Sequence, residues 1–208
     1  MFNLLNQHMI NNFPNYNPVK WYKTIENQIK NADRYPLVQI EFVPITKKEL
    51  EVISSINNIR LERLAFVLLC FAKFNNLRNK NNNNWVNYNI RDIFKIARIP
   101  TTIEKQCLFL NDIKQLGLIK YSKKIENINI NVLYINDNSD IVLKINDFRE
   151  LGYEYMLWKG YKYIRCGECG ILVKQKNNRI KYCKYCAAEN RREIKRKSWH
   201  KNKEKYKN

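Results

Sequence analysis

Four of the six cysteines stand in two close pairs near the end of the chain, and this pattern constrains the fold more than any other. The pairs are Cys166-x2-Cys169 and Cys183-x2-Cys186, with 13 residues between them. A CxxC turn places two sulfurs on one side of an ion, and zinc binds four thiolates as a tetrahedron. In a reducing compartment such pairs bind metal instead of forming disulfides. We therefore predict one structural Zn²⁺ held by these four cysteines.

The segments around the pairs predict a small module at 164–208. ILVKQ and RIKY, at 171–175 and 179–182, alternate as in a short β-hairpin. After Cys186 the chain reads AAENRREIKRKSWHKNKEKY, and the lack of Gly or Pro predicts an uninterrupted basic helix. A knuckle, a hairpin and a second CxxC at the start of a helix resemble a treble-clef zinc finger. We therefore expect a four-cysteine zinc finger followed by a basic C-terminal helix.

Positive charge is concentrated in the same part of the chain. The 208 residues carry 38 Lys and Arg against 19 Asp and Glu, a formal net charge of +19. Residues 161–208 hold 16 of the cations and 4 of the anions, so most of the excess lies in under a quarter of the chain. This excess favours a polyanionic partner, either nucleic acid or, as the competitor, an anionic membrane surface.

The N-terminal sequence and the apolar runs argue against export and membrane insertion. MFNLLNQHMINNF has neither a basic start nor a small-residue cleavage site, so no secretory signal is expected. The longest apolar run, 64–72, is far shorter than the roughly 20 residues of a membrane-spanning helix. We expect a cytoplasmic protein of a bacterium or a phage-infected cell, without a membrane partner.

The first three quarters of the chain predict helices and short strands, so the expected fold class is α+β. Residues 1–45 form an unassigned extension, with a short helix at 18–30 and a strand-like segment at 37–43. Thr46 and Glu49 form a capping box that opens a helical pattern reaching about residue 76. Within it, residues 59–74 are apolar almost all round, as in a buried helix, and Cys70 there is expected to be a small core residue.

A second series of elements follows the Asn-rich loop. Residues 85–87 suit a short strand, and Asn89 can cap a helix over 90–98. Thr101 with Glu104 makes another capping box, for a helix that stops at Gly117. Strand-like segments are expected at 118–122, 130–135 and 141–145. A helix capped by Asp147 and an aromatic connector are expected at 147–163, where Tyr153, Tyr155, Met156 and Trp158 join the C-terminal module to the body; base stacking is the alternative.

The order of helix, short strand, helix, turn, helix and two-stranded wing resembles a winged helix-turn-helix domain. The resemblance covers about residues 59–145 and includes the phrase IKQLGLI at 113–119. It implies a winged-helix domain at 46–146 whose helix 101–116 lies in the major groove of DNA. The layout also resembles small regulators or replication-origin binders of phages and mobile elements.

The predicted nucleic-acid contacts are cations and hydroxyls of the helix-turn-helix, lysines of the wing and two stripes of the C-terminal helix. They are Arg91, Lys95, Arg98, Thr101, Thr102, Lys105, Lys114, Lys120, Lys123, Lys124, Arg191, Arg192, Lys195, Arg196 and Lys203. Helix 101–116 is nearly neutral, so a structural or dimerising role for the winged helix is the alternative. Trp199 is expected to dock onto the body and His200 to face solvent.

No catalytic residue is predicted. The two histidines, His8 and His200, stand near opposite ends, and Cys107 is expected on the buried side of its helix with Ile103 and Leu110. Four thiolates leave zinc no open position for water. The sequence therefore predicts a double-stranded DNA-binding protein with sequence specificity, a transcriptional regulator or origin binder, as a monomer or a homodimer. The alternatives are an RNA or single-strand binder and a protein-interaction or inhibitor module with a basic face.

Overall fold

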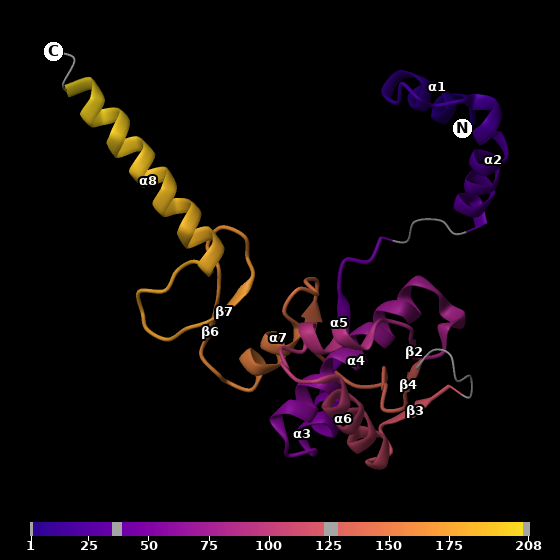
Figure 1. Ribbon diagram of the computed structural model, residues 1–208. Coiled ribbons are helices and arrows are strands. Elements are labelled where there is room, and N and C mark those ends of the chain that lie inside the picture. The colour runs from indigo at the N-terminus through magenta and orange to yellow at the C-terminus, as the bar shows by residue number, and fades with distance from the viewer. Residues whose placement is uncertain (1, 35–38, 123–128, 206–208) are drawn as a thin grey trace. The chain divides into compact units, whose positions relative to one another are not determined.

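The computed structural model describes residues 2–34, 39–122 and 129–205, and it is a mixed α+β protein, as predicted (Figure 1). The chain separates into two compact units, residues 1–40 and residues 41–208. Its α-helices are α1 (Phe2–Asn12), α2 (Pro18–Arg34), α3 (Lys47–Ser54), α4 (Ile59–Arg78), α5 (Ile90–Ile96), α6 (Ile103–Gln115), α7 (Leu151–Trp158) and α8 (Lys184–Lys205). Its strands are β1 (Val43–Thr46), β2 (Trp85–Val86), β3 (Ile119–Tyr121), β4 (Ile130–Val132), β5 (Ile141–Ile145), β6 (Tyr163–Arg165) and β7 (Leu172–Lys174).

The N-terminal unit is a helical hairpin made of α1 and α2. Pro18 stands at the first position of α2, where its missing N–H costs nothing, and the Asn17 side chain accepts two N–H groups of the first turn. The rings of Phe2 and Tyr22 lie 4.9 Å apart and join the two helices. The helix predicted at 18–30 is confirmed and runs four residues further.

Helix α4 is the centre of the second unit. Twelve of its residues are buried, on all of its sides, because α3, α5, α6, α7 and three strands pack around it. The predicted buried helix is therefore confirmed. Cys70 in its middle is fully buried, and burial raises the pKa of its thiol well above the ordinary value. This cysteine fills the core, as expected.

A break separates α3 from α4 where the sequence predicted a continuous helical pattern. The capping box of α3 is confirmed, since the Glu49 carboxylate accepts the Thr46 N–H at 2.8 Å. Beyond α3, Asn57 adopts a φ of 53°, a conformation that Asn tolerates better than most residues. The side chain of Asn58 then accepts two N–H groups at the start of α4.

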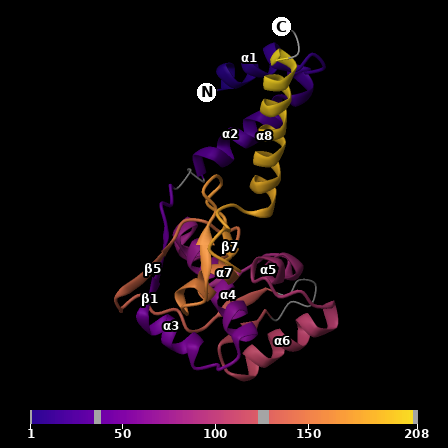
Figure 2. The same cartoon turned by 90° about the vertical axis from the view of Figure 1, so that its left-hand side faces the viewer.

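The strands of the body form two antiparallel sheets. One has the order β2-β4-β3, with β4 in the middle. Strand β5 pairs with β1, with Val43 opposite Ile145, beside α3 (Figure 2). Both of these side chains are buried, so the pairing covers the same face of the core. The strand predicted at 37–43 is wrong in its bounds, because β1 starts at residue 43; residues 35–38 lie outside the described part.

Helices α5 and α6 are close to their predicted positions but differ at their ends. Helix α5 begins after Asn89, as predicted, and ends early because Arg98 has a φ of 57°. Helix α6 is capped by Thr102 and not by Thr101. Its end at Gly117, with a φ of 74°, is confirmed. Cys107 and Ile103 are exposed, so their predicted core positions are wrong, whereas Leu110 is buried as predicted. Gln106 and Ile113 complete the buried side of α6.

Helix α7 is shorter than predicted and lies deeper in the body. Asp147 does not cap it; the helix starts after Glu150, and the Asp147 carboxylate instead accepts N–H groups of Arg149. Tyr155 is fully buried against Phe66, and its hydroxyl donates to Glu62 at 2.8 Å. This burial confirms the packing role expected for Tyr155 and removes its ring from any stacking surface.

Candidate metal centre and basic surface

The four paired cysteines come together at one point of the structure. The sulfurs of Cys166, Cys169, Cys183 and Cys186 all lie within 4.8 Å of one another, and those of Cys169 and Cys183 are 3.8 Å apart. Thiolates that bind zinc tetrahedrally at about 2.3 Å lie about 3.8 Å from one another. The spacing therefore fits a tetrahedral metal ion, and the cluster could hold one.

The first cysteine pair lies in the turn between strands β6 and β7. These strands are antiparallel, with Arg165 opposite Leu172, and Gly170 closes the turn with a φ of 71°. The hairpin predicted from 171–175 and 179–182 is therefore wrong in its pairing. The first of those segments pairs backwards, across the knuckle, and the second forms a loop that leads to Cys183. Alternation of apolar and polar residues predicts a strand, but it does not identify the segment with which that strand pairs.

Backbone N–H groups point at the sulfurs and favour their ionised form. The Cys183 N–H donates to the Cys166 sulfur at 3.2 Å, and the Cys186 N–H donates to the Cys183 sulfur at 3.4 Å. Burial opposes ionisation of Cys166, but N–H groups of Cys169, Cys183 and Glu168 outweigh it and lower its pKa to about 6. Hydrogen bonding with Cys183, followed by burial, raises the pKa of Cys186 to about 12. A bound divalent cation would reverse that shift, because it favours the thiolate.

Helix α7 and the residues just before it attach this cysteine module to the body. Arg149 donates to the carbonyl oxygen of Cys169 at 2.9 Å, and Arg165 of β6 pairs with Glu154 of α7 at 2.8 Å. The rings of Tyr153 and Tyr163 lie 4.7 Å apart beside these polar contacts. These contacts attach the β6–β7 turn, which carries the first cysteine pair, to the helical core.

Helix α8 begins between the last two cysteines of the cluster and leaves the hairpin as one straight rod (Figure 1). Every side chain from 191 to 200 is exposed, including those of the predicted contacts Arg191, Arg192, Lys195 and Arg196. Arg192 pairs with Glu189 at 3.2 Å. His200 is exposed, as predicted, and Trp199, which was expected to dock onto the body, is 58% exposed. The side chain of Lys203 lies outside the described part.

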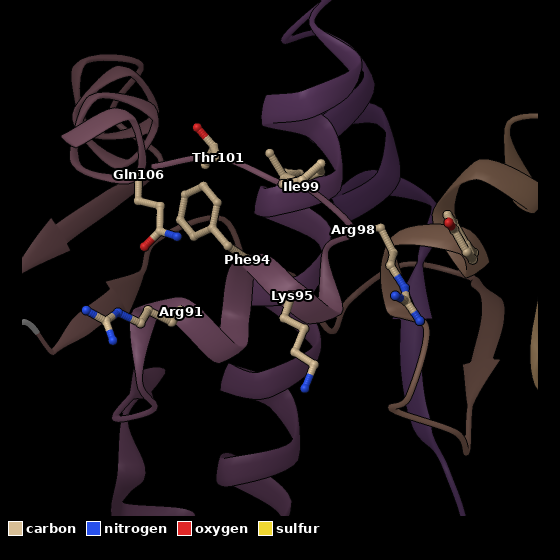
Figure 3. Close-up of a pocket in the computed structure, with 9 residues that line it drawn as sticks. Arg91, Phe94, Lys95, Arg98, Ile99, Thr101 and Gln106 are labelled. Carbon is tan, nitrogen blue, oxygen red and sulfur yellow. The ribbon is translucent and has the colours of Figure 1, made fainter. Parts of the chain in front are cut away.

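A groove on the body gathers four other predicted contacts. Arg91, Lys95, Arg98 and Thr101 line a cavity of about 510 Å³ between α5, the segment that leads to α6, and Tyr153 of α7. Figure 3 shows the side chains of Arg91 and Lys95 extending from α5, with the Gln106 amide near the ring of Phe94. Arg98 is bound by the Glu150 carboxylate, which raises its pKa and offsets its charge. The cationic part of this groove is therefore Arg91 and Lys95.

The remaining predicted contacts are dispersed. Thr102, Lys105, Lys114 and Lys120 are exposed, and the ammonium of Lys114 lies 5.0 Å from the centre of the Tyr121 ring. Lys123 and Lys124 fall in a segment that lies outside the described residues. The structure thus brings together the cysteines and, separately, the α5 cations, while the α6 and β3 lysines stand apart from both.

Sequence reasoning missed the residues that hold these pieces in place. Arg149 supports the metal centre from 17 residues before its first cysteine, and no local pattern marks it. No motif marks the Asn-rich loop either, yet the Asn82 amide donates to the Asn76 side chain at 2.9 Å and the Asn131 amide donates to the Asn83 carbonyl oxygen at 2.6 Å. These amides fix the loop to α4 and to β4.

No helix in the described residues is long and apolar enough to cross a membrane. No protein-family model, curated protein or solved structure matches this chain. Its class is therefore given by its own structure: a mixed α+β protein with a four-cysteine cluster that could hold a metal ion.

Proposed function

We propose that the protein binds double-stranded DNA and that a zinc-nucleated basic helix grips the phosphate backbone. The observation that carries the proposal is α8, which begins in the cysteine cluster and bears nine Lys and Arg against three Glu. From residue 191 to residue 200 all of its side chains are exposed. A fully exposed helix of this charge has no core to cover, and a polyanion would relieve its self-repulsion.

Zinc is the metal that suits the cysteine cluster best. Four thiolates with tetrahedral spacing are a soft donor set, which selects Zn²⁺ or iron over magnesium and calcium. Bound zinc would supply structure and no chemistry, since four sulfurs fill its coordination. The cluster fixes the first turn of α8, and the partial positive charge at that helix end favours the thiolates. The metal would thus start the helix that carries the charge.

The winged-helix part of the proposal rests on the order of elements. Helix α4, strand β2, helices α5 and α6 and strands β3 and β4 follow one another as in such a domain, and the sheet order β2-β4-β3 agrees with it. In this proposal α6 enters the major groove, and Arg91 and Lys95 hold a phosphate in the groove at the end of α5. The protein would then be a transcriptional regulator or origin binder, as its layout suggests.

A titration of the zinc-loaded protein against fluorescent duplex DNA, single-stranded DNA and RNA of equal length tests this function. We expect the tightest binding to duplex DNA, measured by anisotropy, and weaker binding by a chain that ends at residue 160. A preference for single strands would contradict the duplex proposal and favour the RNA or single-strand alternative. Equal, weak binding to all three would contradict nucleic acid as the partner.

One observation favours a protein partner for α6 itself. Its exposed side includes Ile103, which is 51% exposed, and Leu108, which is 63% exposed. The exposed Glu104 and Asp112 also offset the charge of Lys105 and Lys114. Interfaces with proteins tolerate such apolar, weakly charged surfaces better than interfaces with DNA do. Replacing Leu108 by Lys would leave DNA affinity unchanged or raise it if α6 lies in a groove, and would disrupt a protein complex if it does not.

A further inference from the structure

The N-terminal unit exposes most of its apolar side chains. Among the apolar side chains that the structure describes in this unit, only that of Ile25 is buried. Seven large apolar residues are exposed, and we call them the N-terminal apolar surface. They are Leu4, Leu5, Ile10, Phe13, Val19, Trp21 and Tyr22. Leu4 is 78% and Val19 87% exposed, which is unusual for residues on helices of a folded unit.

Few contacts hold this hairpin together. They include the ring pair Phe2–Tyr22 and a hydrogen bond from the Tyr16 hydroxyl to the Asn6 side chain at 2.6 Å. A unit of about 40 residues is at the lower limit of what a single core can stabilise, and units of this size usually need a metal, disulfides or association. This unit has no cysteine, and it does not bury these apolar side chains within itself, so they are available to pack against another surface.

The charge pattern identifies the partner. Residues 1–19 contain no Asp, Glu, Lys or Arg and form the longest uncharged stretch of a chain whose net charge is +19. Two copies of so cationic a chain repel one another wherever their basic surfaces meet. The α1 part of the N-terminal apolar surface, which lies in this uncharged stretch, is where they can meet without that cost. We propose that this surface binds the same surface of a second copy of the chain. The α1 and α2 helices of the two copies would then bury the apolar side chains that one copy leaves exposed.

A membrane fits the same observations less well. An anionic lipid surface attracts clustered cations, and 16 of the 38 Lys and Arg lie near the other end of the chain, at residues 161–208. In the N-terminal unit the cations of α2, Lys20, Lys23, Lys30 and Arg34, are partly offset by Glu26 and Asp33. An apolar surface whose first helix lacks any Lys or Arg has little electrostatic attraction to lipid headgroups. The proposal does not depend on DNA binding, so it stands or fails separately from the function proposed above.

Sedimentation equilibrium of the whole 208-residue chain over a wide range of concentration tests the proposal. The wild type is expected to reach close to twice the chain mass of 25.2 kDa. The double variant Leu4→Lys, Ile10→Lys places like charges on the surface, and its association should be weaker by about tenfold or more. The control Leu77→Lys, Leu116→Lys changes two exposed leucines (42% and 52%) in the second unit and should dimerise as the wild type does.

A rescue experiment separates lost association from failed folding. Mixing the Leu4→Lys, Ile10→Lys protein with a Leu4→Glu, Ile10→Glu protein should restore a dimer, because the two altered surfaces attract each other. A wild type that stays monomeric would overturn the proposal, whether or not it binds vesicles of phosphatidylcholine and phosphatidylserine. So would a dimer that survives the double variant, or one that only the control disrupts.

Discussion

The guanidinium of Arg149 donates a hydrogen bond to the carbonyl oxygen of Cys169 at 2.9 Å, and the same guanidinium is held by Asp147 at 2.7 Å. One arginine thereby joins the segment before α7 to the turn that carries the first cysteine pair. Because α8 starts at the other cysteine pair, this contact fixes where the basic helix leaves the body. Arg149 thus attaches the metal centre to the helical core.

Replacing Arg149 by Ala should loosen the metal centre without unfolding the core. Groups that orient the ligands of a metal typically affect its affinity by 10–100-fold, and we expect a value of about tenfold here, because Arg149 touches the ligand's backbone and not its sulfur. Release of zinc to a chromogenic chelator measures it. Arg179→Ala, an exposed arginine of the same module, is the control. Equal zinc affinities in both variants would show that the contact does not support the site.

The ion pair between Arg149 and Asp147 is expected to weaken at low pH. The hydrogen bond from Arg149 is the main reason that the pKa of Asp147 lies below its ordinary value. A carboxyl whose pKa is lowered in the folded state adds stability above its unfolded pKa and loses it as the pH falls through the folded pKa. The Asp147 carboxyl carbon, followed by NMR, should therefore titrate below the ordinary range in the wild type and move up in Arg149→Ala. An unchanged midpoint would contradict the pairing.

Loss of the metal should unfold α8 and leave the body intact. In Cys183→Ser the cluster lacks a ligand beside the first residue of α8, and the helix, exposed from 191 to 200, has little packing to sustain it. Amide spectra should show α8 disordered while residues 41–160 keep their shifts. Cys107→Ser, which removes an exposed thiol outside the cluster, should change neither metal content nor helicity. A helical α8 in Cys183→Ser would refute metal nucleation.

The buried ion pair between Lys73 and Glu49 is expected to contribute to the free energy of unfolding. The ammonium of Lys73 lies 2.8 Å from Glu49 Oε1, with the two side chains 4% and 0% exposed. Removing one member leaves the other charge buried, which typically costs about 3–5 kcal/mol. Lys73→Met should lower the free energy of unfolding in urea by about that amount. The exposed control Lys48→Ala should stay within about 0.5 kcal/mol of the wild type. A loss for Lys73→Met no larger than the control's would contradict this.

Features of the fold that depend on only a few neighbouring residues could be predicted from the sequence. The Thr46–Glu49 box, the stop at Gly117 and the paired cysteines each act over a few residues, and each is found where it was expected. Even there the N-cap of α6 is Thr102 and not the predicted Thr101, because local signals place a helix end only to within a residue or two.

Contacts between distant segments could not be predicted in the same way. The pairing of β1 with β5 and of β6 with β7 depends on which apolar faces the core brings together, and alternation alone names no partner. No sequence pattern indicated that Arg149 reaches Cys169 or that Arg98 would be bound by Glu150. Such polar contacts exist only after the helices have packed.

The salt dependence of duplex binding tests the central claim most directly. Arg191, Lys195 and Arg196 would be replaced together by Ala, and the charge-matched control would replace Lys47, Lys48 and Lys144, which are exposed on α3 and β5. If α8 grips phosphates, the first variant should weaken binding to every sequence and lower the slope of log affinity against log salt by about 2.7, while the control keeps the wild-type slope. The same slope in both variants would show that α8 does not hold the DNA backbone.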